Sequence, residues 1–283
     1  MNPNLPAARV LRLGGRVLDL DRPRVMGIVN ATPDSFFDRG RHAAATHALA
    51  HARTLLADGA DIVDVGGEST RPGARAIDPV EECARVLPVI RALTADGATV
   101  SVDTSSAEVM EAAHHAGAQM INDVRALRSP GALEVAARSG AAVCLMHMQG
   151  TPADMQAAPH YEDVVAEVCA FLASRAAACE AAGIARERII VDPGFGFGKT
   201  LGHNLALLHA LPRIGALGYP VLAGLSRKGS LGHITGRPVE ERLAASIAAA
   251  LAAVARGAAM VRVHDVRETV DALAVWLAVA DER

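Results

Sequence analysis

A carboxylate followed by a glycine-rich loop is the part of the sequence best suited to chemistry. Asp192 ends the apolar run 188–191, and the loop after it reads Pro193-Gly194-Phe195-Gly196-Phe197-Gly198-Lys199-Thr200. A phosphate-binding P-loop needs four residues between its first glycine and Gly-Lys-Ser/Thr, so this spacing excludes one. The strict alternation of the three glycines also differs from the dinucleotide-binding fingerprint. A carboxylate beside two aromatic rings suits a flat, hydrogen-bonding heterocycle better than a phosphate.

Other apolar runs also end at hydrogen-bonding side chains. Three of these ends carry one acceptor each, and three more carry four cationic or imidazole groups between them: Asp103, Asn122, Asp192, Arg71, Lys228, Arg262 and His264. The acceptors suit the donor edge of a heterocycle, and the cations with His264 suit an anion or an electron-rich ring atom. Arg262 and His264 are two positions apart, so they share one face of a strand. The sequence therefore predicts one site for a heterocycle, with cations placed for an anion or for an electron-rich atom of the ring.

Each of these residues also has a simpler interpretation when it is taken alone. Asp103 precedes Thr104 and Ser105 and could be a helix N-cap. Asn122 could be an Asx-turn residue, and His147 reads as a packed histidine rather than a ligand. No His, Cys or carboxylate cluster has zinc spacing, and no Gly-x-Ser-x-Gly elbow occurs.

The elements that must position these residues alternate between strand and helix. Eight short apolar strands are expected at 25–29, 62–65, 99–102, 119–121, 142–146, 189–191, 221–225 and 260–263. Helical periods fall at 42–58, 79–95, 107–116, 132–139, 161–182, 204–211, 238–256 and 266–280. Eight such units predict a closed (β/α)₈ TIM barrel over 24–283, with a doubly wound open sheet as the alternative. Gly14-Gly15 between two short apolar runs predicts an N-terminal β-hairpin over 9–20 that covers one end, so 1–283 is expected to be a single domain.

Composition limits the class of protein. The net charge of −3 and the lack of a basic stripe argue against nucleic acid as a partner. The longest apolar run, 243–255, is shorter than the ~20 residues of a membrane span, and no signal peptide is evident at the N-terminus. The four cysteines are scattered through apolar surroundings, which favours reduced thiols and a cytoplasmic location.

Several segments resemble the dihydropteroate synthase family, in the family's order and from about Val25 to the C-terminus. They are 27–36 (GIVNATPDSF), 64–73 (DVGGESTRPG), 101–104 (SVDT), 121–123 (IND), 192–199 (DPGFGFGK), 225–228 (LSRK) and 262–265 (RVHD). The resemblance implies a (β/α)₈ barrel, usually a homodimer. It also implies the condensation of 6-hydroxymethyl-7,8-dihydropterin pyrophosphate with p-aminobenzoate, which releases pyrophosphate in folate synthesis.

The resemblance assigns a role to each matching position. The pterin would be bound by Asp103, Asn122, Met146, Asp192, Phe197 and Lys228. The pyrophosphate would be bound by Asn30, Thr70, Arg71, Arg262 and His264, with Mg²⁺ held by Asn30 and phosphate oxygens. The p-aminobenzoate would be bound by Phe36, Thr70, Pro72, Lys228, Gly229 and Ser230. The catalytic set would be Arg262, His264, Lys228 and Asp38.

The chemistry explains why no general base stands out. An aromatic amine is uncharged at pH 7, so its lone pair is already free. The barrier lies in breaking the C–O bond to pyrophosphate, and Mg²⁺, Arg262 and His264 would stabilise the charge that develops on the leaving group. The resemblance therefore implies a dissociative mechanism.

Phe37, Arg39 and Gly229 depart from the family pattern near the p-aminobenzoate site. Gly229 replaces the serine that the family usually places after the lysine. Either Ser230 or the Gly229 backbone N–H takes over its role, or the glycine is required by a positive φ. The remaining alternatives are a non-catalytic pterin-binding paralogue and a pterin-dependent methyltransferase, which lacks the Ser-Arg-Lys and Arg-x-His groups.

Overall fold

The computed structural model describes residues 10–31, 40–68 and 77–281, with side chains given from residue 44 in the second range and up to residue 280 in the third. Eight parallel strands form a barrel: β3 (Arg24–Asn30), β4 (Ile62–Gly66), β5 (Val100–Asp103), β6 (Met120–Asp123), β7 (Ala142–Met146), β8 (Ile189–Asp192), β9 (Leu222–Ala223) and β10 (Met260–Val263). The strand order is β8-β7-β6-β5-β4-β3-β10-β9, and a parallel bridge between Val191 and Val221 joins its two ends. This closure confirms the predicted barrel and excludes the doubly wound open sheet.

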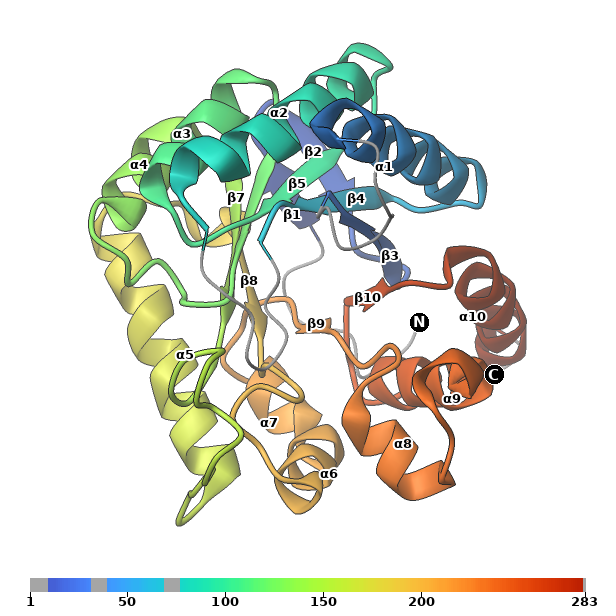
Figure 1. Cartoon of the computed structure of the whole chain (residues 1–283). Coiled ribbons are helices and arrows are strands. Elements are labelled where there is room, and N and C mark those ends of the chain that lie inside the picture. Colours follow the sequence, from blue (N-terminus) through green and yellow to red (C-terminus); the bar gives the residue numbers. More distant parts are fainter. Residues whose placement is uncertain (1–9, 32–39, 69–76, 282–283) are drawn as a thin grey trace.

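Helices surround the strands as an outer ring (Figure 1). They are α1 (Gly40–Ala57), α2 (Pro79–Ala95), α3 (Ala107–His115), α4 (Ala132–Ser139), α5 (Val164–Ala181), α6 (Leu201–His209), α7 (Leu211–Gly215), α8 (Gly229–Thr235), α9 (Leu243–Val254) and α10 (Val266–Asp281). Two of them begin at side-chain caps: Asp78 accepts from the Val80 N–H at the start of α2, and Ser106 accepts from the Val109 N–H at the start of α3. The predicted helix 238–256 begins instead as a 3₁₀ turn, Val239–Glu241, before α9, and α7 and α8 were not predicted.

The N-terminal hairpin covers the end of the barrel at which the strands begin. Strands β1 (Val10–Leu13) and β2 (Arg16–Asp19) pair antiparallel around Gly14, whose φ is +60°. Leu11, Leu13 and Leu20 are buried and pack against side chains inside the barrel, including Met26, Ile62, Met120, Ile190 and Met260. Burying this apolar surface stabilises the fold and closes that end, so the predicted hairpin and its covering role are confirmed over 10–19.

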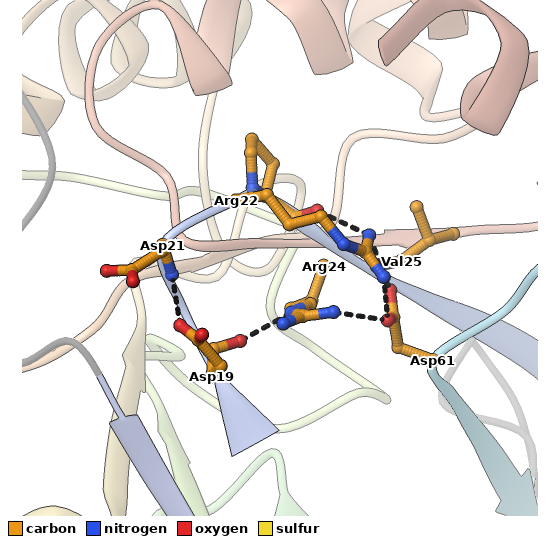
Figure 2. Close-up of polar contacts among 7 residues, drawn as sticks. Asp19, Asp21, Arg22, Arg24, Val25 and Asp61 are labelled. Carbon is orange, nitrogen blue, oxygen red and sulfur yellow. Dashed lines mark hydrogen bonds and ion pairs between the residues drawn. The ribbon is translucent and has the colours of Figure 1, made fainter. Parts of the chain in front are cut away.

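Asp61 ties the start of β3 to the start of β4 at the same end of the barrel (Figure 2). Its Oδ1 accepts from Arg22 Nη2 at 2.6 Å and from Arg24 Nη1 at 2.9 Å, and its Oδ2 accepts from the Val25 N–H at 2.9 Å. The Arg24 Nε donates to the Asp19 carbonyl at the end of the hairpin. One carboxylate thus links the hairpin exit and two barrel strands, which leaves the opposite end of the barrel for a ligand.

A second apolar core fills the space between the strands and the helices. It includes Val63, Val102, Val143, Leu93 and Leu172, none of which is exposed. Within the described residues, none of the helices has the length and apolar character needed to cross a membrane.

Candidate active site

A cleft of about 1130 Å³ opens at the carboxyl ends of the barrel strands. All predicted site residues that fall within the described ranges line this one cleft: Asn30, Asp103, Asn122, Met146, Asp192, Phe197, Lys228, Gly229, Ser230, Arg262 and His264. The other five predictions, Phe36, Asp38, Thr70, Arg71 and Pro72, lie outside the described residues. Strand ends from the whole barrel therefore converge on a single site, as expected for this fold.

The glycine-rich loop holds Asp192 at the end of β8. The Gly194 N–H donates to Asp192 Oδ1 at 2.7 Å, which fixes one carboxylate oxygen. Gly194 has a φ of +69°, and a Cβ added there would lie 1.9 Å from the His147 carbonyl oxygen. This position therefore accepts only glycine. Burial raises the pKa of Asp192, while the Gly194 N–H and then Lys228 oppose the rise.

Lys199 locks the same loop from inside, a role that sequence reasoning missed. It is buried, and its Nζ donates to the carbonyls of Gly194 at 2.9 Å, Phe197 at 3.0 Å and His147 at 3.2 Å. The only signal was a lysine at the end of a glycine-rich loop, which first suggests a phosphate ligand. In the structure Nζ bonds three backbone carbonyls and lies 3.0 Å from His147 Nδ1, so Lys199 fixes the position of the Phe197 backbone.

Arg262 joins two carboxylates across the barrel. Its Nε donates to Asp64 Oδ2 at 2.7 Å and its Nη2 donates to Asp103 Oδ2 at 2.7 Å. Asn122 Nδ2 donates to the same Asp64 oxygen at 2.8 Å. Burial raises the pKa of Asp103 to about 7; Arg262 opposes the rise and Asp64 adds to it.

These bonds decide between the two interpretations of Asp103 and Asn122. The N-cap of α3 is Ser106, so Asp103 is not a helix cap. The Asn122 amide donates to Asp64 across the barrel, which differs from the backbone bond of an Asx turn. Asp64 itself was not predicted as a site residue, because it lies in the middle of an apolar strand rather than at its end.

Lys228 lies over the Phe197 ring, with its Nζ 4.1 Å from the ring centroid. Burial lowers the pKa of Lys228 to about 8; Arg262 lowers it further, while Asp192 and Asp103 oppose. Phe197 also packs against a small apolar cluster that contains Met146 and Met155. The cleft thus has an apolar wall beside a cation, which suits the face and edge of a flat ring.

His264 is held by Ser226. The Ser226 Oγ lies 3.0 Å from His264 Nδ1 and accepts from the His264 backbone N–H at 3.2 Å. Burial lowers the pKa of His264 to about 4, and Arg262 and Arg227 add to this effect. The imidazole is therefore neutral near pH 7. Arg227, with a φ of +56°, pairs with Asp265 through Nε and Oδ2 at 3.0 Å.

Two polar strand-end residues turn out to be structural. Asp123 accepts from the N–H groups of Arg125 at 2.8 Å and Leu127 at 2.7 Å, and Leu127 has a φ of +56°. Its carboxylate therefore stabilises the turn after β6. His147 is buried, packs edge-on against Phe171 and contacts Lys199 Nζ through Nδ1 at 3.0 Å. Its prediction as a packed histidine is confirmed.

The chemistry of the cleft is compatible with a metal that is held mainly by phosphate. Among the described residues there is no group of three or more His, Cys, Asp or Glu that could hold a metal ion. Asn30 ends β3, lines the cleft and offers a hard amide oxygen. Mg²⁺ is commonly bound by one or two protein oxygens together with substrate phosphates, so this donor fits it.

Comparison with known proteins agrees with this arrangement. A model of the family described as "Pterin binding enzyme" matches residues 26–264. The barrel and its cleft thus define a pterin-binding enzyme. The dihydropteroate synthase of Neisseria meningitidis serogroup B is 53% identical over 277 residues, which cover 95% of this chain and 97% of the relative.

Two solved structures show the same similarity. The Xanthomonas albilineans dihydropteroate synthase with 4-aminobenzoic acid superposes with a TM-score of 0.92 at 56% identity, covering 97% of this chain and 99% of that chain. A structure of the Xanthomonas albilineans enzyme in complex with 7,8-dihydropteroate gives a TM-score of 0.88 at 54% identity, covering 96% and 98%. The chain belongs to the dihydropteroate synthase family.

Proposed function

We propose that this chain is a transferase that condenses 6-hydroxymethyl-7,8-dihydropterin pyrophosphate with p-aminobenzoate to give 7,8-dihydropteroate and pyrophosphate. The observation that carries the proposal is the convergence in one cleft of buried acceptors with the cations Lys228 and Arg262. Relatives at 53% identity over nearly the whole chain carry the name of this activity. The product is an intermediate of folate biosynthesis.

The pterin ring is bound through its donor edge. Asp192 accepts from the ring N–H and the exocyclic amine, two parallel donors that match one carboxylate. Asp103 and the Asn122 Oδ1 accept from the rest of this edge, and Lys228 donates to the ring oxygen and nitrogen on the opposite edge. Met146 and Phe197, which belong to one apolar cluster, cover the ring faces.

The pyrophosphate leaves with the electron pair of the C–O bond that joins it to the pterin methylene. Arg262 keeps N–H groups beyond those that bind Asp64 and Asp103, and these donate to phosphate oxygens. His264 is neutral, and with the Ser226 hydroxyl donating to Nδ1, its Nε2 carries the hydrogen and donates to the same group. The electron-rich pterin spreads the positive charge left on the methylene.

The amine of p-aminobenzoate then forms the new C–N bond and loses one proton. No residue has to activate it, since its lone pair is free at pH 7. Gly229 and Ser230 line the cleft beside Lys228 and bind the benzoate carboxylate. Phe36, Asp38, Thr70, Arg71 and Pro72 are proposed to complete the substrate sites.

A bound Mg²⁺ would neutralise charge on the leaving pyrophosphate, with Asn30 as its protein ligand. Asn30 lies at the carboxyl end of β3, on the strand beside Arg262 in the sheet. The ion and the arginine would therefore act on the same phosphate groups.

Homodimer formation is proposed through a groove between α6, α8 and α9. The groove has a volume of about 260 Å³ and is lined by Leu205, Leu208, Leu231, Ile234 and Ala249 among others. Leu205 and Ile234 are 47% and 54% exposed and line the same groove, so they form part of one exposed apolar patch. A second copy placed by a two-fold axis would cover the same face on both chains.

The cytoplasm is the proposed location, because all four cysteines are free thiols.

A coupled assay for pyrophosphate, with both substrates and Mg²⁺, tests the proposed activity. We expect release only when p-aminobenzoate and the pterin pyrophosphate are both present, and accumulation of 7,8-dihydropteroate in equal amount. Binding of 6-hydroxymethylpterin without turnover would instead identify a non-catalytic pterin-binding protein. Methyl transfer from a methylated pterin, without pyrophosphate release, would identify the methyltransferase alternative.

A further inference from the structure

Asp64 lies one layer below the residues that line the cleft. Strand β4 pairs with β5 so that Asp64 is opposite Ser101, while Gly66 is opposite Asp103. Strand β5 pairs with β6 so that Asp103 is opposite Asn122. Asp103 and Asn122 are therefore at the same level, and Asp64 is two residues closer to the closed end of the barrel. Its side chain is completely buried.

A single oxygen of Asp64 supports two residues of the site from below. Oδ2 accepts from Asn122 Nδ2 at 2.8 Å and from Arg262 Nε at 2.7 Å. The first bond fixes which end of the Asn122 amide is the donor toward the barrel interior, so the other end, Oδ1, remains as an acceptor for the cleft. The second bond fixes the inner edge of the Arg262 guanidinium and leaves its terminal nitrogens directed at Asp103 and the leaving group.

Stability alone does not account for a carboxylate at this position. Within the described part of the chain, Asp64 Oδ1 and the neighbouring Ser101 Oγ are buried without a hydrogen-bond partner. An unpaired buried oxygen on a charged group is costly, and apolar residues in its place are often neutral or stabilising. Buried polar atoms without a hydrogen-bond partner are the kind of local departure that is expected at functional positions.

We propose that Asp64 is a positioning residue of this enzyme: its Oδ2 sets the Asn122 amide with Oδ1 toward the pterin and holds Arg262 over the site of the leaving pyrophosphate. This inference rests on the proposed binding of the pterin by Asn122. Asp64 touches neither substrate and acts through these two side chains.

A double-mutant cycle with 6-hydroxymethylpterin as the probe tests the role of Asp64 toward Asn122. Asp64→Ala frees the Asn122 amide, and we expect about 10- to 100-fold weaker binding in calorimetry, the range for a misaligned group in a buried site. Asn122→Ala should weaken binding by a similar factor. The double variant should be no weaker than Asn122→Ala alone, because Asp64 acts through that amide.

Matched variants separate positioning from a general effect on the barrel. Ser101→Ala removes the hydroxyl opposite Asp64 and should leave the affinity unchanged. Asp64→Asn keeps an oxygen that can accept both bonds and should retain most of the affinity. If Asp64→Ala does not fold, Asp64→Val takes its place in the cycle, since it fills a similar volume without a polar atom.

The outcomes distinguish the two proposals. Additive effects of the Asp64 and Asn122 substitutions, or normal pterin affinity in Asp64→Ala, would overturn the positioning role while leaving the proposed function intact. Normal pterin affinity in Asn122→Ala would overturn both the role of Asn122 and the inference built on it. The positioning of Arg262 by Asp64 is tested by steady-state kinetics. Asp64→Ala should lower kcat, while the KM for p-aminobenzoate stays near that of the unmodified chain.

Discussion

Arg262 Nη2 and Asp103 Oδ2 form an ion pair at 2.7 Å, although the two side chains are proposed to bind different parts of one substrate. Asp103 accepts from the pterin edge, and Arg262 donates to the pyrophosphate. The charge on each is balanced by the other, since Arg262 opposes the rise in the Asp103 pKa. Recognition of the ring and of the leaving group is therefore electrostatically coupled.

The pH dependence of pterin binding should reflect Asp103 and Lys228. Burial raises the pKa of Asp103 to about 7, so below this pH it carries a proton and presents a donor to the donor edge of the pterin. Burial lowers the pKa of Lys228 to about 8, so above this pH the ammonium loses its charge. We expect the affinity for 6-hydroxymethylpterin, measured by calorimetry, to be highest between about 7 and 8.

The same experiment on Lys228→Met provides the control. This variant should bind more weakly but lose the decline on the alkaline side, while the acidic decline remains. A wild-type affinity that is constant across this range would show that neither group changes protonation where it binds the ring.

Replacing Asp192 by asparagine should abolish useful pterin binding without harming the fold. The Gly194 N–H, 2.7 Å from Oδ1, selects an oxygen at that position, so the new NH₂ must face the cleft. A donor then meets the donor edge of the pterin, and each unpaired buried group costs roughly 1–3 kcal/mol. Calorimetry with 6-hydroxymethylpterin should show the loss, while the melting temperature and the affinity for inorganic pyrophosphate stay unchanged. Near-normal pterin affinity would contradict the proposed role of Asp192 in binding the pterin edge.

The positions of the strand ends could be predicted because eight apolar runs each stop at polar residues, and the carboxyl ends of parallel strands meet at one end of a barrel. Asp123 follows Asn122 directly in the sequence, so the two look alike as site residues. Alternation along the strand places their side chains on opposite faces. Asp64 could not be found from strand ends. It stands within the strand, and its role depends on Arg262, which the sheet brings beside it from 198 positions away.

Helix α8 shows a different limit. Its seven residues include Gly229 and Gly232, which read as a loop by propensity. The helix forms because Leu231 is buried in the apolar core between the strands and the helices, and Gly236, with a φ of +70°, ends it. Tertiary packing of this kind overrides a weak local signal and is not visible in the residue pattern.

Gly194→Ala should disrupt the loop that holds Asp192. The new Cβ would lie 1.9 Å from the His147 carbonyl oxygen at a φ of +69°, so the backbone has to move. We expect a lower melting temperature and pterin affinity reduced by about tenfold or more, because the N–H that fixes Asp192 shifts with it. Gly202→Ala in α6 is the matched control: its nearest heavy atom would be Thr200 Oγ1 at 3.8 Å, so melting should rise slightly or not change. Equal behaviour of the two variants would contradict the steric argument.

Gly229→Ser tests how the carboxylate of p-aminobenzoate is bound. Gly229 is the first residue of α8, its φ is outside the positive region, and an added Cβ would have no heavy atom within 4 Å. The alternative that this glycine is required by its backbone conformation is therefore wrong. A serine hydroxyl fits here without strain, so turnover should be retained.

The size of the effect tells which group now binds the carboxylate. If the Gly229 backbone N–H acts alone, the new hydroxyl adds a hydrogen bond worth about 0.5–1.5 kcal/mol, and the KM for p-aminobenzoate should fall by at most roughly tenfold. If Ser230 already supplies the hydroxyl, Gly229→Ser should leave the KM unchanged and Ser230→Ala should raise it. Gly229→Ala, which adds the Cβ without the hydroxyl, should match the unmodified chain in both cases. Loss of turnover in Gly229→Ala would contradict the free space found around this position, and no response of the KM in either serine variant would place the carboxylate site away from the start of α8.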